Sequence, residues 1–522
     1  MNRLARLLVL ALLFTCRPTL FAQAAPVRTA RYVALVVVDG MRADYLNVFP
    51  TPSIHELMAR GASWDGAWVG HVVNNTPPGH ATISSGCFPR THGIVDFIWT
   101  NSSGRVQNHT TLEAVIRGDL ARMASARNTP SIAKLVKQSD PTARTATIGS
   151  HKYYAVGSLA LDSSDCTILK AESRNIDVGI KDKPFECKEG RFIKGQRPPT
   201  DTLRTIRDSG GGGDKWSMEA AITVLKDLRP RALLVNLPNV DGAGHASGGI
   251  IDLPAMKRSV TMADHKIGEL VQAYKDLGIY DETLFVVVGD HGMMLRESPI
   301  SDEALARILK DNDVRQVAGA GSGTLWLSDA SKSARVAEAI MSSKPRAASA
   351  GYFKTRIDGR YVYLPAAGQP TIRPTLAAAY DYLLSTVACE SGPDVVICSK
   401  EMSIVPDEFP KKGKHYQISW GSQHIPIIFA GPGVRKGAVS MSAARLVDVA
   451  PTILALMGIE PKGMEGIVLA DAMVHPRRFR QIAQQQMNQA LKPLRNALRN
   501  QPRYDPTGLL TESDLKLDAG SE

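Results

Sequence analysis

Runs of apolar residues that end in a polar residue mark the expected strands of this chain. Val, Leu and Ile follow one another in these runs without alternation, which is typical of strands covered on both faces. We expect strands at residues 32–38, 232–237, 284–288 and 425–430, with helical patterns between them at 130–138, 217–228 and 255–277. Strands that alternate with helices predict an α/β fold, with a mostly parallel central sheet and helices on both faces.

Chemically active side chains follow these strands directly. Asp39 comes after the first strand, Asp241 after the second, and Asp290 with His291 after the third. Because ligands of such sheets gather at the carboxyl ends of strands, we expect these side chains to lie together. His245 stands four residues after Asp241, a spacing that directs both side chains of one helical turn to one metal ion.

Two stretches do not follow this alternation of strands and helices. Residues 296–417 mix short helical patterns with a hairpin-like piece at 352–364, and we expect an insertion that caps the site. Residues 476–522 are basic and rich in Gln, then polar, and are expected to form a partly disordered tail. Residues 26–295 and 418–475 then make up the discontinuous main domain.

The N-terminus has the pattern of a secretory signal. Arg3 and Arg6 precede an apolar run at 7–14, and small residues follow at Ala22, Ala24 and Ala25. The run is shorter than the roughly 20 residues that span a bilayer. Cys16 lies in a poor lipobox, so a lipoprotein is not expected. We predict that residues 1–25 are cleaved, and that the mature protein is periplasmic or secreted and has no transmembrane segment.

An oxidising compartment changes the interpretation of the cysteines. Local disulfides are expected between Cys166 and Cys187 and between Cys389 and Cys398, with Cys87 as a small buried residue.

Part of the formal net charge of +11 comes from basic residues near the C-terminus. Seven basic residues cluster there: Arg477, Arg478, Arg480, Lys492, Arg495, Arg499 and Arg503. Such a run is either a solvated helix face or a weak contact with an anionic surface. It has no interleaved aromatic residues and no recognised motif, so specific nucleic-acid binding is not predicted.

Three aspartates and three histidines near strand ends have the composition of two metal sites. They are Asp39, Asp241, His245, Asp290, His291 and His424. Mixed nitrogen and oxygen ligands fit zinc, although manganese or iron can occupy the same ligands. Thr76, in Asn75-Thr76-Pro77-Pro78-Gly79-His80, adds a hydroxyl that a metal can activate as a nucleophile. The set predicts an enzyme that hydrolyses phosphate esters.

The order of these motifs resembles the alkaline phosphatase superfamily, and most closely its nucleotide pyrophosphatase/phosphodiesterase branch. The resemblance spans roughly residues 31–102, 215–295 and 421–470 and implies an alkaline phosphatase-like fold. The matching pieces are Val36-Val37-Val38-Asp39-Gly40, the Thr76 segment, His92-Gly93-Ile94, Asp241 with His245, Gly289-Asp290-His291-Gly292, and His424.

The resemblance implies a role for each matching residue. Asp241, His245 and His424 would hold one zinc ion. Asp39, Asp290 and His291 would hold the other, next to Thr76. Thr76 would attack phosphorus and form a phosphothreonine. Sulfatases of the superfamily have an oxidised cysteine where this chain has Thr76, so Cys87 does not take that role. The implied substrate is a small phosphate ester, nucleotide-like or another phosphodiester.

Two positions leave the class of ester open. Lys152 loosely matches a substrate-binding lysine of threonine-dependent monoesterases, but Tyr154 stands where their arginine would be. Phe97 stands where the phosphodiesterase branch has an asparagine. We expect a phosphodiesterase. The alternatives are a phosphomonoesterase or phosphonate hydrolase on the same scaffold, or a binding protein without turnover.

Overall fold

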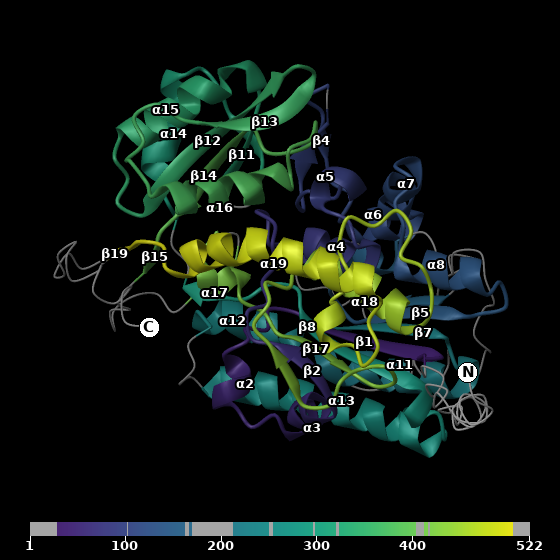
Figure 1. Cartoon of the computed structure of the whole chain (residues 1–522). Coiled ribbons are helices and arrows are strands. Elements are labelled where there is room, and N and C mark those ends of the chain that lie inside the picture. Colours follow the sequence, from purple (N-terminus) through teal and green to yellow (C-terminus); the bar gives the residue numbers. More distant parts are fainter. Residues whose placement is uncertain are drawn as a thin grey trace, which may run out of the picture.

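An eight-stranded sheet forms the base of the molecule (Figure 1). The computed structural model describes residues 29–101, 103–161, 166–169, 212–249, 254–295, 298–319, 323–402, 412–415 and 418–504. The strand order is β18 (Ala438–Ser440), β2 (Gly61–Trp64), β17 (Ile427–Ala430), β8 (Thr283–Gly289), β1 (Tyr32–Val38), β7 (Ala232–Leu237), β5 (Thr145–Gly149) and β6 (Cys166–Leu169). Only β17 runs antiparallel to its neighbours in this sheet, so the predicted α/β class with a mostly parallel sheet is confirmed.

Alternate residues of β1 face two separate apolar layers. Ala34, Val36 and Val38 pack with α3 (Pro52–Arg60), α11 (Gly213–Leu228) and α13 (Pro254–Asp276) on one side. Val33, Leu35 and Val37 pack on the other side with α4 (Thr76–Ser85), α8 (Ile132–Ser139) and α18 (Val449–Leu456). Because successive strand residues point to opposite faces, this division explains why both faces need apolar side chains.

The register of the three central strands determines where the site lies. In β1, Val38 pairs with Leu237 of β7 on one side and with Gly289 of β8 on the other. All three strands are parallel, so their carboxyl ends meet at one edge of the sheet. The residues that follow, from Asp39, from Pro238 and from Asp290, are therefore neighbours.

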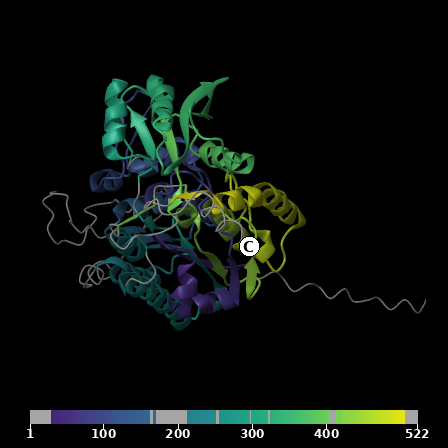
Figure 2. The same ribbon diagram turned by 90° about the vertical axis from the view of Figure 1, so that its left-hand side faces the viewer.

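A second, five-stranded sheet lies above the first in Figure 1 and again in the turned view of Figure 2. Its order is β10 (Gln316–Ala318), β11 (Thr324–Leu327), β14 (Val395–Ser399), β12 (Ala348–Ile357) and β13 (Arg360–Pro365), all in antiparallel pairs. Helices α14 (Asp302–Asp311), α15 (Ser333–Ser342) and α16 (Pro374–Ser385) accompany it. The predicted hairpin is β12–β13, and both turn residues, Asp358 and Gly359, have positive φ.

The described part of the basic tail is helix and strand, and its polar end at 511–522, where disorder is expected, lies outside the described residues. Helix α19 (Arg478–Arg499) crosses the molecule between the two sheets (Figure 1), and β19 (Arg503–Tyr504) pairs with β15 (Glu401–Met402). Leu491 and Leu498 are buried on one side of α19. Arg480 and Arg495 are buried with them, so the basic residues do not share one solvated face.

The cysteine and membrane predictions have separate outcomes. Cys87, Cys389 and Cys398 are free thiols, so the expected Cys389–Cys398 disulfide does not form. Cys87 is buried, as expected. Cys187 and the signal at 1–25 lie outside the described residues. Within the described residues, no helix has the length and apolar character needed to cross a membrane.

Candidate active site

Asp39 and Gly40 form the tight turn that brings three aspartates together. Asp39 directly follows β1 and is fully buried. The backbone N–H of Gly40 donates to Asp290 Oδ1 at 3.0 Å. Gly40 has a φ of +75°, and an added Cβ would lie 2.7 Å from the Cα of Asp241. This position needs glycine for both reasons, because any side chain would displace Asp241.

Asp241 and His245 occupy successive turns of α12 (Asn239–Ser247). His245 Nε2 lies 3.4 Å from Asp241 Oδ1, which agrees with the predicted spacing. The start of this helix is held by Asp214 in α11, whose Oδ1 accepts the backbone N–H of Asn239 at 2.9 Å. Burial raises the pKa of Asp214 to about 7. Neither the strand pattern nor the motifs pointed to Asp214.

Thr76 is the first residue of α4 and is buried beside the histidines. Its Oγ1 lies 3.3 Å from His291 Nε2. Pro77 and Pro78 fix the backbone of the first turn, and because they have no N–H they cost the helix no hydrogen bonds there. His80 donates from Nδ1 to the Thr76 carbonyl oxygen at 2.9 Å, and its Nε2 lies 2.8 Å from Asn236 Oδ1. The hydroxyl is therefore held on a rigid helix start.

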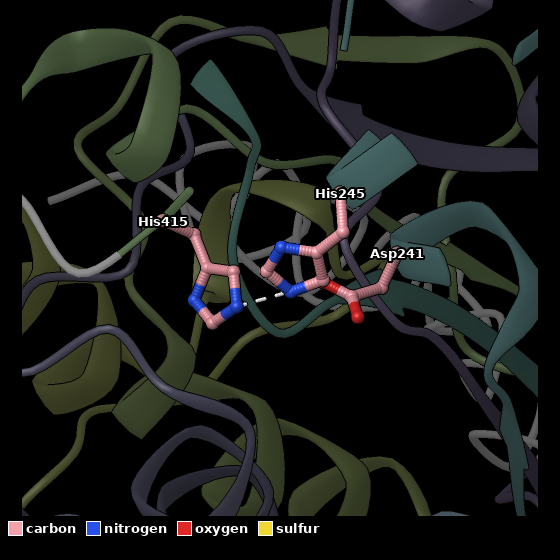
Figure 3. A group of neighbouring side chains, drawn as sticks. All are labelled: Asp241, His245 and His415. Atoms are coloured by element: carbon pink, nitrogen blue, oxygen red, sulfur yellow. Dashed lines mark ion pairs between the residues drawn. The ribbon is translucent and has the colours of Figure 1, made fainter. Parts of the chain in front are cut away.

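His415, and not His424, completes the histidine group. His415 Nε2 lies 3.6 Å from Asp241 Oδ1, and its ring stacks on that of His291 with 3.6 Å between centroids. Figure 3 shows His415 and His245 converging on Asp241 from different elements. His415 follows β16 (Gly413–Lys414) and was not among the predicted residues.

The position of His424 corrects the prediction made for it. Its Nε2 lies 2.9 Å from the carbonyl oxygen of Asp65, and its ring stacks on Trp420 with 4.7 Å between centroids. These contacts fit a structural role at the entry to β17, and none of the candidate metal groups among the described residues includes His424. The other predicted ligands, Asp39, Asp241, His245, Asp290 and His291, do lie together.

The three clustered histidines are oriented in the same way. Each Nδ1 lies close to a backbone carbonyl oxygen: His245 to Gly413 at 2.9 Å, His415 to Asn74 at 3.0 Å and His291 to Gly292 at 2.9 Å. Because a carbonyl oxygen only accepts, each Nδ1 must carry the proton. A ring that carries its proton on Nδ1 alone presents the lone pair of Nε2, and each Nε2 faces a buried carboxylate. This is the second-sphere arrangement of metal-binding histidines.

Each of the three aspartates has a buried carboxylate oxygen that lacks a hydrogen bond and that a cation could bind. Asp39 Oδ2, Asp241 Oδ1 and Asp290 Oδ2 are buried and accept no hydrogen bond. Buried carboxylate oxygens are costly without a hydrogen bond or a positive partner. Three groups have ligand atoms within 4.8 Å of one another: Asp241, His245 and His415; Asp39, Asp241 and His291; and Asp39, His80 and Asp290. The residues present therefore fit divalent metal ions.

Lys152 lies within this cluster. Its Nζ is 2.9 Å from Asp39 Oδ1 and also pairs with Asp241 Oδ2. Burial lowers the pKa of Lys152, but the charges of Asp241 and Asp39 outweigh it and raise that pKa well above its usual range. Burial and the neighbouring Asp290 raise the pKa of Asp39 to about 7. Lys152 is therefore a buried cation at the site and not a solvated lysine of the surface.

The phosphodiesterase branch has an asparagine at the position of Phe97, whereas the side chain of Phe97 has no hydrogen-bond donor and packs against its neighbours. The Phe97 ring meets Tyr154 edge to face, with 4.9 Å between centroids. The buried carboxylate of Asp96 accepts hydrogen bonds from the Phe97 backbone N–H and from Asn75 Nδ2. Asn101 lies in an exposed turn, where its Oδ1 accepts backbone N–H groups of Ser103 and Arg105.

An α/β sheet with buried Asp and His residues and a threonine at the carboxyl ends of its strands defines a candidate metal-dependent hydrolase. The chain belongs to the type I phosphodiesterase / nucleotide pyrophosphatase family, whose model matches residues 33–367. This finding confirms the predicted branch of the alkaline phosphatase superfamily. Members of this family are phosphoric ester hydrolases.

A curated relative and two solved structures show how far the similarity extends. The chain is 26% identical over 283 residues to an uncharacterised pyrophosphatase/phosphodiesterase of Schizosaccharomyces pombe, covering 52% of this chain and 46% of the relative. The chain thus spans about half the length of that curated relative.

The solved structures support the fold. Wild-type alkaline phosphatase PafA has a TM-score of 0.63 at 15% identity, covering 85% of this chain and 99% of that one. Human ectonucleotide pyrophosphatase/phosphodiesterase 5 has a TM-score of 0.57 at 17% identity, covering 85% and 100%. The predicted alkaline phosphatase-like fold is confirmed.

Proposed function

We propose that this chain is a phosphodiesterase of the nucleotide pyrophosphatase type that uses Thr76 as its nucleophile and two divalent metal ions, Zn²⁺, as cofactors. One observation carries the proposal: the Thr76 hydroxyl lies 3.3 Å from His291 Nε2, beside buried Asp and His side chains that fit metal ions. The signal pattern at residues 1–25 supports a periplasmic or secreted location.

The two metal sites divide the ligands as follows. Asp241, His245 and His415 would hold one ion, and Asp39, Asp290 and His291 would hold the other. Nitrogen and oxygen donors in this mixture suit Zn²⁺. When bound, the ions polarise the phosphoryl oxygens and lower the pKa of a coordinated hydroxyl.

Thr76 performs the covalent chemistry on the bound ester. Its Oγ1 attacks phosphorus while the bond from phosphorus to the leaving oxygen breaks, and the hydroxyl proton passes to solvent. The products are an alcohol, which takes a proton from solvent, and a phosphothreonine that still carries the second ester group. A water molecule then attacks phosphorus while the bond from phosphorus to Thr76 Oγ1 breaks. The phosphate monoester leaves, the water loses a proton to solvent, and Thr76 regains its hydroxyl proton. Two in-line displacements give net retention of configuration at phosphorus.

The second sheet, in residues 316–399, supports the site and forms the proposed cap. One apolar cluster joins Val72 and Val73, which lead to Thr76, with Tyr352 and Tyr380 of the second sheet and its helix. This packing holds the segment before the nucleophile. We assign residues 296–417 to the cap on this basis.

A phosphomonoesterase is the second candidate, and Lys152 is the observation that favours it. A monoester carries an additional negative charge, which a buried ammonium group can hold. Purified, zinc-loaded protein should be tested on bis-p-nitrophenyl phosphate and on p-nitrophenyl phosphate. We expect a higher kcat/KM for the diester. A faster monoester reaction would favour the second candidate. No turnover of either ester would favour the third alternative, a binding protein without enzymatic activity.

Replacing Lys152 with Ala should lower the stability of chelator-treated protein more than that of zinc-loaded protein. Without the ammonium group, Asp39 and Asp241 lose their positive partner, a change that costs about 3–5 kcal/mol for a buried pair. Zinc supplies the missing charge, so zinc should raise the Tm of Lys152→Ala more than that of the wild type.

Lys354 provides the matched control for this measurement. Lys354 is half-buried and pairs with the buried Asp394 at 3.2 Å in the second sheet. Lys354→Ala should lose stability as well, but zinc should raise its Tm only as much as it raises that of the wild type. Equal zinc effects on both variants would show that Lys152 does not share the metal carboxylates.

A further inference from the structure

Exposed apolar side chains gather where α19 begins. Among the described residues, ten large hydrophobic side chains are exposed, and five of them lie between residues 439 and 482. We call these five the apolar patch: Val439 at 68% exposure, Met441, Val474, Phe479 at 56% and Ile482. Contiguous exposed apolar groups mark an interaction surface more often than isolated ones.

Hydrogen bonds hold the segments of the apolar patch next to one another. The backbone N–H of Val474 donates to the Gly433 carbonyl oxygen at 2.9 Å, and that of Arg435 donates to Ala472 at 2.8 Å. The hydroxyls of Ser440 and Ser442 both bind the Asp471 carboxylate. The Ala443 N–H in turn donates to Asn488 Oδ1 of α19 at 3.1 Å. Gln484, in the second turn of α19, accepts the backbone N–H of Asp471 and donates to the Ser442 hydroxyl. The end of β18 and the first turns of α19 therefore lie side by side.

The apolar patch faces away from the core on both elements. Phe479 and Ile482 are three residues apart on α19 and are exposed, whereas Arg480 and Gln484 of the same helix are buried. Val439 and Met441 are two residues apart along the edge strand β18 and its continuation, so they point to the same side. A hollow of about 210 Å³ between the two elements is lined by amide, hydroxyl and carboxylate groups, including Ser442, Asp471 and Gln485.

Cations surround the apolar patch. Arg435 and Lys436 precede β18, and Arg477 and Arg478 begin α19; all four are exposed. Two carboxylates near these cations already have partners: Asp471 accepts hydrogen bonds from two serine hydroxyls, and Glu460 pairs with Arg480 at 3.4 Å. The positive end of the α19 dipole lies here as well. The charged part of this surface is therefore complementary to an anionic partner.

We propose that the apolar patch and its four cations dock the protein on an anionic lipid surface, with Phe479 and Ile482 inserted at the level of the headgroups. Apolar side chains ringed by Lys and Arg are typical of proteins that lie on such a surface. A second copy of the chain fits less well, because a two-fold contact would bring the same cations together. The contact uses the start of α19 and not the whole basic tail, since Arg480 and Arg495 are buried.

Vesicle co-sedimentation tests this proposal directly. The full chain should bind vesicles of equal parts phosphatidylcholine and phosphatidylglycerol, should bind phosphatidylcholine vesicles weakly, and should lose binding as salt increases. Phe479→Ser/Ile482→Ser and Arg477→Glu/Arg478→Glu should each lower the partition coefficient by at least about ten-fold. Val48→Ser/Met262→Ser removes two exposed apolar side chains elsewhere and should bind like the wild type.

Several outcomes would overturn the proposal. They are no preference of the wild type for anionic vesicles, or equal binding by the patch variants and the control variant. A concentration-dependent dimer that Phe479→Ser/Ile482→Ser abolishes would assign the surface to a second copy instead. All variants keep residues 1–28, so that segment contributes equally to each comparison of a variant with the wild type. Unchanged ester hydrolysis and circular dichroism show that the variants are folded.

Discussion

Replacing Thr76 with Ala is expected to lower kcat for a phosphodiester by about 10⁴-fold or more, which is the scale seen when a covalent nucleophile is removed. The variant has no oxygen to form the phosphothreonine, and no other described hydroxyl takes its position beside His291. Its zinc content should stay close to that of the wild type, because the Asp and His ligands remain. Steady-state kinetics and metal analysis of the same preparation would show both results.

Two further variants make the Thr76 result specific. Thr76→Ser keeps a hydroxyl and should retain part of the activity. Ser84→Ala removes a buried hydroxyl from the same helix, one that forms no hydrogen bond with the protein, and should leave kcat nearly unchanged. If Thr76→Ala turned over the diester at the wild-type rate, the nucleophile would have to be another group.

Replacing His415 with Ala is expected to remove about one of the two zinc ions and to lower kcat/KM by about 10²-fold or more. The reason is that His415 Nε2 faces Asp241 beside His245, and two protein ligands hold zinc much less firmly than three. Metal analysis after dialysis against a weak chelator would measure the loss.

His424 offers the matched control for His415. Its ring contacts Trp420 and the Asp65 carbonyl oxygen, so His424→Ala should lower the free energy of unfolding by about 1 kcal/mol and keep both zinc ions. The opposite pattern, with zinc lost from His424→Ala and kept in His415→Ala, would restore the assignment that the resemblance implied.

The sequence predicted those parts of the molecule that local pattern determines. β1 and β7 begin and end where the apolar runs do, because a short run with Val and Leu on both faces is typical of a buried strand. Asp39 and Asp290 were found because each follows such a run. Asp241 and His245 were found because four residues make one helical turn. That β17 runs antiparallel was not visible, because its apolar run would look the same in either direction.

Tertiary contacts decided the positions that the sequence did not predict. His415 follows only the two-residue strand β16, which no apolar run marks in the sequence, and its place beside Asp241 depends on how the chain returns from the second sheet. Gly421-Ser422-Gln423-His424 stands before β17 and was the more conspicuous candidate. Similarly, the many Gln and Arg residues of α19 obscured its apolar positions in the sequence. Leu491 and Leu498 are buried there, and Leu498 packs in the apolar cluster of the second sheet. Cys398 packs in an apolar cluster and forms no disulfide.

Anomalous X-ray diffraction at the zinc edge, from crystals grown with zinc, tests the central claim most directly. The claim is that Thr76 acts within a two-metal site completed by His415. We expect two anomalous peaks, one among Asp241, His245 and His415, and the other among Asp39, Asp290 and His291 next to Thr76 Oγ1. A peak at His424, or no peak within the Asp39–Asp241–Asp290 cluster, would contradict the account.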